Sequence, residues 1–207
     1  MGRGRFISFE GGEGVGKTTQ IGRLAAFLRD RGIDVVVTRE PGGTEVGEAI
    51  RGVLLDKSLP AMHADTELML MYAARVEHVW RLIRPALEAG QWVLSDRFAD
   101  ASHVYQGVGR GLDPARIEAL DDWSLRGFAP DRTILFDMPV EAGMARVRSR
   151  GATDRFEEEK LAFFERVRQG YLDRARRFPE RFVVIDAARE IDAVTRDLIR
   201  VVSSWLS

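Results

Sequence analysis

The chain has 207 residues, a length that suits one domain with a full hydrophobic core. Its formal net charge of −1 argues against a nucleic-acid-binding surface, although 28 of its 31 basic residues are arginine. It contains no cysteine, which excludes disulfides, and its three histidines lack the spacing of zinc ligands, which argues against a structural zinc site. It has no run of 18 apolar residues and no secretory leader, so we expect a cytoplasmic protein that binds neither nucleic acid nor membranes.

Apolar runs alternate with helical patterns along the whole chain, which predicts an α/β fold with a parallel sheet and helices on both faces. The expected strands are Phe6–Phe9, Ile33–Thr38, Trp92–Ser95, Arg132–Asp137 and Phe182–Asp186. Several are β-branched and almost continuously apolar, as strands covered on both faces should be. Ligands of such sheets bind beyond the carboxyl ends of the strands, so the residues after each strand are candidates for the site.

The first strand is followed by a glycine-rich segment that fits the phosphate-binding pattern G-x-x-x-x-G-K-[ST]: Gly11-Gly12-Glu13-Gly14-Val15-Gly16-Lys17-Thr18. Glycines let backbone N–H groups point at phosphate oxygens, and the following helix adds the positive end of its dipole. We expect Lys17 to reach the β- and γ-phosphates and the Thr18 hydroxyl to bind Mg²⁺. Residues from Gly11 to Thr19 are therefore the candidate ATP site.

The second strand leads into Thr38-Arg39-Glu40-Pro41-Gly42-Gly43-Thr44, a turn by composition whose Glu-Pro bond is a candidate for the cis isomer. In the helical pattern that follows, Arg51 has the spacing to face the same cleft. A longer helical pattern covers residues 65–88, and its apolar stripe, which includes Met71, is typical of core. Arg75 interrupts that stripe, and a buried arginine should meet an anion, a carboxylate or a base edge.

Asp96 and Arg97 follow the third strand. An acid at this place typically completes the Mg²⁺ site of a phosphate-binding-loop protein, directly or through a water molecule. Arg97 could clamp a second phosphoryl group, and the alternative is an ordinary surface ion pair. Ser102, Tyr105 and Gln106 come next, and they offer the hydroxyl, ring and amide that recognition of a flat base would use.

Four arginines surround a turn of small residues after the fourth strand: Arg146, Arg148, Arg150 and Arg155. This charged segment predicts a small helical lid at about residues 148–158, whose arginines could stabilise the charge of a transferring phosphoryl group. A solvated pair of helices is the alternative. No repeat or linker divides the sequence, so we expect residues 1–207 to form one domain.

Together these residues resemble the thymidylate kinases of the bacterial type over nearly the full length of the chain. The matching signatures are Phe9 to Thr19, Thr38 to Thr44, Tyr72-Ala73-Ala74-Arg75, Asp96-Arg97 and Tyr105-Gln106-Gly107. The resemblance implies a three-layer P-loop NTPase fold with a five-stranded parallel sheet and typically a homodimer. It also implies transfer of the γ-phosphoryl group of ATP, with Mg²⁺ as cofactor, to dTMP, giving ADP and dTDP for DNA synthesis.

The resemblance places a set of residues around dTMP: Glu13, Arg39, Arg51, Met71, Arg75, Arg97, Ser102, Tyr105 and Gln106. Within this set, Glu13 would contact the 3′-hydroxyl of the deoxyribose, and Arg97 would hold the phosphate with help from Arg39 and Arg51. Arg75, Ser102 and Gln106 would read the thymine edge, and Tyr105 would lie under the sugar. Many relatives have phenylalanine in place of Met71, whose sulfur can still pack on a ring.

The catalytic residues that the resemblance implies are Glu13, Lys17, Arg97 and Arg155, with Thr18 and Asp96 at the metal. The family has two catalytic layouts, and one of them places an arginine directly after the acid of the loop. This chain has Gly14 there and follows the other layout, in which the lid supplies the arginine, here Arg155.

Two other functions stay open on the sequence. One is another nucleoside-monophosphate or deoxynucleoside kinase of the same fold, acting on UMP, dCMP or a deoxynucleoside. The other is a nucleotide-dependent ATPase switch that binds a partner. A GTPase switch usually reads guanine with an Asn-Lys-x-Asp motif, and this chain contains no asparagine. A partitioning ATPase would carry an extra lysine where this chain has Gly12.

Overall fold

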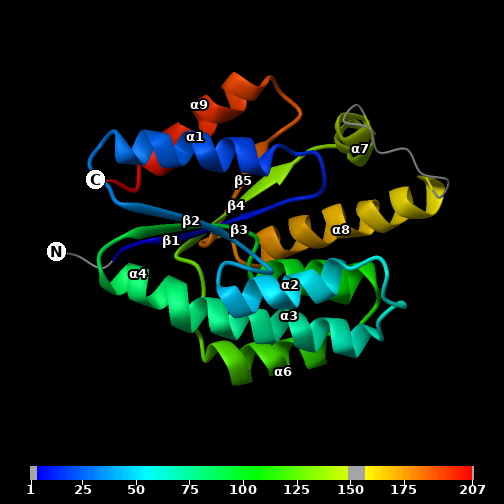
Figure 1. Ribbon diagram of the computed structural model, residues 1–207. Coiled ribbons are helices and arrows are strands. Elements are labelled where there is room, and N and C mark those ends of the chain that lie inside the picture. The colour runs from blue at the N-terminus through cyan, green and yellow to red at the C-terminus, as the bar shows by residue number, and fades with distance from the viewer. Residues whose placement is uncertain (1–3, 149–156, 207) are drawn as a thin grey trace.

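The structure, a computed structural model, describes residues 4–148 and 157–206. Within these ranges five parallel strands form one sheet in the order β2-β3-β1-β4-β5, which confirms the predicted fold class (Figure 1). Most of the predicted lid at about 148–158, including Arg150 and Arg155, lies outside the described residues. The strands are β1 (Phe6–Glu10), β2 (Val35–Arg39), β3 (Trp92–Asp96), β4 (Arg132–Asp137) and β5 (Phe182–Asp186).

Helices cover both faces of the sheet, with α1 and α9 on one face and α3, α4 and α8 on the other (Figure 1). No helix in the described part of the chain is long and apolar enough to cross a membrane. The helical elements are α1 (Lys17–Arg29), α2 (Glu45–Leu55), α3 (Ala64–His78), η1 (Val79–Ile83), α4 (Arg84–Glu88), α5 (Ala99–Ser102), η2 (His103–Gly109), α6 (Pro114–Leu125), α7 (Val140–Arg148), α8 (Glu157–Arg177) and α9 (Ile191–Ser203).

The long helical pattern predicted over residues 65–88 is a continuous run of α3, the π-helical turn η1 and α4. The apolar residues of η1 and α4 pack on the sheet, where Val79 and Ile83 join Phe6 of β1 in one buried cluster. Leu68 and Tyr72 of α3 pack instead with Ile117 of α6. Ile7 and Phe9 point to the opposite face and pack against α1 and α9. β1 is buried on both faces, so packing fixes the position of its carboxyl end. The glycine-rich loop begins at that end.

The second strand begins two residues later than predicted, at Val35 instead of Ile33. Gly32 adopts a left-handed conformation after α1, and the N–H of Ile33 bonds to the carbonyl of Leu28, so Ile33 belongs to the helix end. β1 and β3 each extend one residue further than predicted, to Glu10 and Asp96. Asp96 is therefore the last residue of its strand.

Candidate active site

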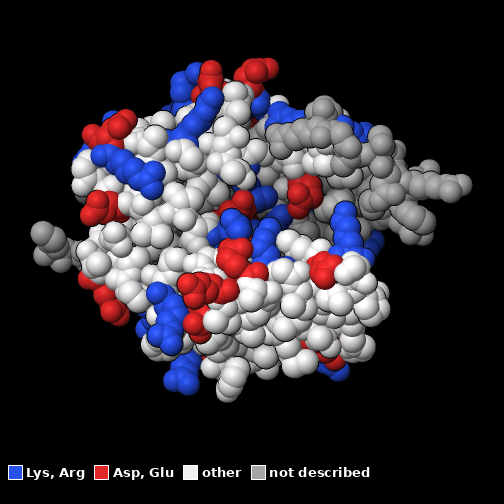
Figure 2. Space-filling view, viewed as in Figure 1, with Lys and Arg blue, Asp and Glu red and all other residues white. Residues whose placement is uncertain are grey.

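A cleft of about 530 Å³ opens at the carboxyl ends of β1, β2 and β3. Figure 2 shows basic and acidic side chains gathered in the hollow at the centre of this face. Most of the predicted site residues line the cleft: Glu13, Gly14, Val15, Gly16, Lys17, Thr18, Thr19, Arg39, Arg51, Met71, Arg75, Asp96, Arg97, Tyr105 and Gln106. Segments far apart in the sequence therefore meet at one place.

The glycine-rich loop between β1 and α1 ends at Gly16, whose φ of 87° is left-handed. Lys17 begins α1 and folds back over the loop, where its Nζ donates to the carbonyls of Gly11 and Gly12 at 3.2 Å each. Burial, and next the positive charge of Arg97, lower the pKa of Lys17 to about 8. A phosphate oxygen at this place would stabilise the ammonium ion.

The backbone of the loop also lies close to the backbone of helix α7. A Cβ added to Gly14, which has a φ of 74°, would lie 2.1 Å from the carbonyl oxygen of Gly143. A Cβ added to Gly143 would lie 2.4 Å from the carbonyl oxygen of Glu13. Neither glycine leaves room for a side chain without a movement of the backbone.

Arg97 has a left-handed backbone, with a φ of 75°, which costs about 1–3 kcal/mol and needs support from its surroundings. Its N–H donates to the carbonyl of Phe9 at 2.9 Å, and the Ser95 hydroxyl donates to its carbonyl at 2.7 Å. Its Nη2 donates to Glu13 Oε1 at 2.9 Å and to the Tyr105 hydroxyl at 3.0 Å. The guanidinium is thus held next to the loop.

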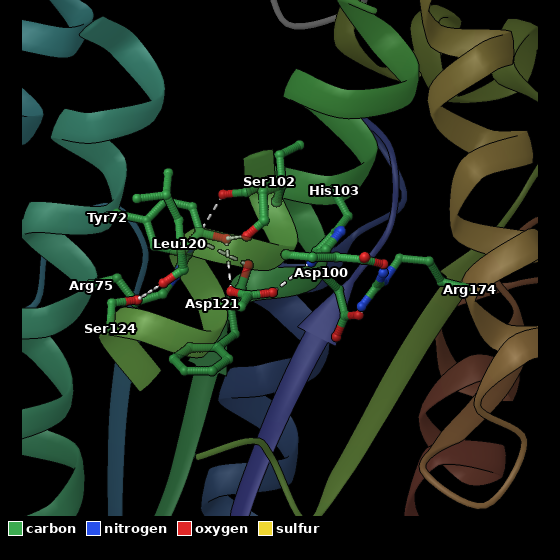
Figure 3. A network of polar contacts seen from close by, with 12 residues as sticks. Tyr72, Arg75, Asp100, Ser102, His103, Leu120, Asp121, Ser124 and Arg174 are labelled. Atoms are coloured by element: carbon green, nitrogen blue, oxygen red, sulfur yellow. Dashed lines mark hydrogen bonds and ion pairs between the residues drawn. The ribbon is translucent and has the colours of Figure 1, made fainter. Parts of the chain in front are cut away.

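Arg75 lies in the floor of the cleft and is buried. Its Nε donates to Glu40 Oε2 at 2.7 Å, and its Nη2 donates to the Ser102 hydroxyl at 3.0 Å (Figure 3). The other oxygen of Glu40 lies 3.0 Å from His78 Nδ1, and His78 Nε2 lies 2.7 Å from the Thr38 hydroxyl. The Glu40–Pro41 bond is cis, as predicted. The expected carboxylate partner of Arg75 is therefore Glu40.

Ser102 does not line the cleft. It is fully buried, and its hydroxyl accepts the hydrogen bond from Arg75 on the side away from the cleft. The guanidinium carbon of Arg75 lies 4.5 Å from the centre of the Tyr72 ring, so the ring stabilises the same guanidinium. The Tyr72 hydroxyl donates a hydrogen bond to Asp121 at 2.7 Å. Asp121 also meets His103 at 2.6 Å, so α6 is joined to the floor of the cleft (Figure 3).

Three buried polar atoms of residues that line the cleft have no hydrogen-bond partner among the described residues: Arg75 Nη1, Gln106 Oε1 and Asp96 Oδ1. The amide nitrogen of Gln106 donates to Glu67 Oε1 at 2.9 Å. An ionised carboxylate only accepts hydrogen bonds, so this contact fixes the orientation of the amide. Arg75 and Gln106 therefore offer one buried donor and one buried acceptor to a ligand.

The residues predicted for Mg²⁺ fit that ion. Thr18 is exposed to the cleft, and Asp96 Oδ1 is buried without a hydrogen-bond partner in the described part of the chain. The described residues contain no group of three or more His, Asp or Glu side chains that could hold a metal. Mg²⁺ needs no such cluster, because it typically takes one or two protein ligands and completes its shell with phosphates and water.

Several residues of the site received no role from the sequence. Glu40 had an indirect signal, because a buried arginine requires a carboxylate, but the sequence does not say which one. His78 and Tyr171 had no signal. Tyr171 lies 74 residues after Arg97, and only the fold brings its hydroxyl to 3.1 Å from Arg97 Nη1.

The parallel sheet, the glycine-rich loop after its central strand and the cleft with Lys17 and Arg97 define a phosphotransferase with a P-loop NTPase fold. The family model described as thymidylate kinase matches residues 9–198. The chain belongs to the thymidylate kinase family.

Curated relatives agree with this family. A thymidylate kinase of Nitrosomonas eutropha is 53% identical, and the match covers 100% of this chain and 96% of the relative. One of Alcanivorax borkumensis is 54% identical and covers 96% of both chains. One of Pseudomonas putida is also 54% identical, over 94% of this chain and 93% of the relative.

Proposed function

We propose that the protein transfers the γ-phosphoryl group of ATP to dTMP and releases ADP and dTDP. Residues from Gly11 to Thr19 bind the triphosphate, with the Lys17 ammonium on the β- and γ-phosphates. Thr18 and Asp96 hold Mg²⁺, which neutralises phosphate charge when it is bound. The acceptor occupies the part of the cleft between Arg97 and the floor at Arg75.

One observation carries this proposal: the unpaired buried donor of Arg75 and the unpaired buried acceptor of Gln106 belong to residues that line the same cleft. Thymine offers a carbonyl oxygen next to an N–H group, which complements a donor and an acceptor. Cytosine offers an amino group next to an unprotonated ring nitrogen, the reverse pattern. Because Glu40 already pairs with Arg75, the floor is close to neutral and suits an uncharged base.

The phosphate of the acceptor is assigned to Arg97. Its guanidinium fork matches phosphate bidentately and lies next to the loop that would hold the donor. Arg39 and Arg51 line the same cleft, and Arg51 is held by the carbonyl of Pro41 at 2.9 Å. Glu13 accepts from Arg97, so it both fixes this arginine and lies within reach of the acceptor's sugar.

A panel of acceptors tests the function. ADP release with ATP and Mg²⁺ is measured with dTMP, dUMP, UMP and dCMP, and without any acceptor. We expect strong release with dTMP and the weakest release with dCMP, whose base edge mismatches Arg75 and Gln106. A preference for dCMP would refute the assignment of the floor, and hydrolysis that needs no acceptor would favour an ATPase switch.

We also propose that Arg155 is the catalytic arginine. Gly14, at the position of the alternative arginine, is left-handed and touches the backbone of Gly143, so a side chain does not fit there. Arg155→Ala is expected to lower kcat by about a hundredfold with little change in KM for dTMP. The double variant with Gly14→Arg should not recover activity. Full kcat in Arg155→Ala would contradict the assignment.

We further propose a homodimer that acts in the cytoplasm. Support comes from large apolar side chains that are exposed on α2, α3 and α6: Val46, Val53, Met69 and Trp123. Because α2, α3 and α6 are neighbouring helices, these side chains lie on one side of the fold, and a group of exposed apolar side chains is typical of a surface that a partner covers. Sedimentation equilibrium should give twice the chain mass of 23.3 kDa, whereas a monomer alone at micromolar concentration would refute the dimer.

A further inference from the structure

Glu10, the last residue of β1, carries a carboxyl group that is fully buried beneath the cleft. Its Oε1 accepts from the backbone N–H of Phe98 at 2.8 Å. Its Oε2 accepts from the Tyr171 hydroxyl at 2.7 Å. Phe98 directly follows Arg97, so one carboxyl group holds the backbone next to Arg97 and also a tyrosine of α8.

The Tyr171 hydroxyl links this carboxyl group to the side chain of Arg97. It accepts from Arg97 Nη1 at 3.1 Å and donates to Glu10, so both hydrogen-bonding directions of the hydroxyl are used. Burial, and next the charge of Glu10, raise the pKa of Tyr171, which keeps the phenolic proton in place. The guanidinium is therefore oriented from below by Tyr171 and from the cleft side by Glu13 and Tyr105.

The position of Tyr171 is itself fixed by ion pairs on both sides of it along α8. Arg168 binds both oxygens of Asp137 at 2.8 and 2.9 Å. Arg174 pairs with Asp100, a buried residue of α5 (Figure 3). Because α5 starts two residues after Arg97, α8 and the Arg97 segment are held together as one unit.

The surroundings of Glu10 make it a weaker acid than an exposed glutamate. Burial, and next the negative charge of Asp100, raise the pKa of Glu10 to about 8, against the opposing effects of Arg97 and the two hydrogen bonds. Lys17 is a further charged group that interacts with it. A buried carboxyl group that accepts two hydrogen bonds and does not line the cleft indicates a positioning role.

We infer that Glu10 and Tyr171 are positioning residues of the acceptor site, which set the direction of the Arg97 guanidinium without touching the substrate. The inference rests on the proposed role of Arg97 in holding the acceptor phosphate. It predicts that variants of these residues change kcat/KM for dTMP and leave KM for ATP unchanged.

Tyr171→Phe removes one hydroxyl and tests this inference. We expect kcat/KM for dTMP to fall about tenfold, because Arg97 loses one of its oriented contacts, while KM for ATP stays unchanged. Ser8→Ala is the matched control: it removes a buried hydroxyl of β1, the strand of Glu10, whose hydrogen-bond partner among the described residues is Thr133, and it should keep wild-type kinetics. An equal loss in Ser8→Ala, or an equal change in KM for ATP, would overturn the inference.

A double-mutant cycle with Arg97→Ala separates this inference from the proposed function. In the Arg97→Ala background, Tyr171→Phe should cost nothing further, since the group that it orients is gone. Additive losses would overturn the positioning role. If Arg97→Ala alone left KM for dTMP unchanged, the proposed function of Arg97 would fail instead.

Glu10→Gln provides a conservative variant. Its amide oxygen can accept from Phe98, and its amide nitrogen can donate to the Tyr171 oxygen, which keeps the contact but reverses the direction of that hydrogen bond, so we expect less than about a threefold loss in kcat/KM for dTMP. The pair Glu10→Gln and Tyr171→Phe leaves no unpaired carboxylate in the core, and this double variant secures the test if Tyr171→Phe alone folds poorly. It should show the tenfold loss, and wild-type kinetics would contradict the inference.

Discussion

Replacing Arg97 with alanine is expected to lower kcat/KM for dTMP by about a hundredfold or more. The guanidinium is held by Glu13, Tyr105 and Tyr171 with its fork next to the loop, so the acceptor phosphate meets a charge that is already oriented. Steady-state kinetics with dTMP as the varied substrate would show the loss in both kcat and KM.

The control for this experiment is Arg126→Ala. Arg126 is the other non-glycine residue with a positive φ in the described part of the chain, and it is exposed at the end of α6, away from the cleft. Both substitutions place alanine on a left-handed backbone, so strain affects them alike. A comparable loss in the two variants would show that folding, and not phosphate binding, explains the effect.

Lys17→Ala is expected to lower kcat by about a hundredfold or more, since the variant loses the cation that meets the transferring phosphoryl group. Lys57→Ala is the matched control, because it removes an exposed lysine outside the cleft. A turnover of Lys17→Ala within a few-fold of the wild type would contradict the assignment of the loop as the donor site.

The lowered pKa of Lys17 adds a pH dependence to ATP binding. Bound phosphate stabilises the ammonium ion and raises this pKa above about 8, so binding near pH 8 takes up protons. The affinity for ATP is then fully present below pH 8 and weakens as the pH rises above it. Calorimetry in buffers of different ionisation enthalpy should detect this uptake in the wild type, and an unchanged uptake in Lys17→Ala would refute the explanation.

The sequence was most informative where structure depends on neighbouring residues. The loop from Gly11 to Thr18 is contiguous, and the apolar character of the strands follows from burial on both faces, so pattern alone located them. The start of β2 was misplaced because Ile33 is apolar in either role. Only the left-handed turn at Gly32 assigns it to the helix end.

Contacts between distant segments could not be predicted in this way. The need of Arg75 for a partner was evident, but the choice of Glu40 depends on how β2 and α3 are placed around the floor of the cleft. Ser102 was expected at the base edge and lies behind Arg75, because the direction of a short side chain depends on the rotation of its helix. Tyr171 reaches Arg97 only through the packing of α8.

The backbone contact between Gly14 and Gly143 places the same size limit on two positions that are distant in the sequence. Enlarging either residue pushes the loop and α7 apart, and a second change at the other position cannot relieve the clash because both sides are already glycine. In a library of randomised variants selected for activity, both positions should therefore remain glycine. Engineering of the donor site has to keep these two positions and vary the residues around them.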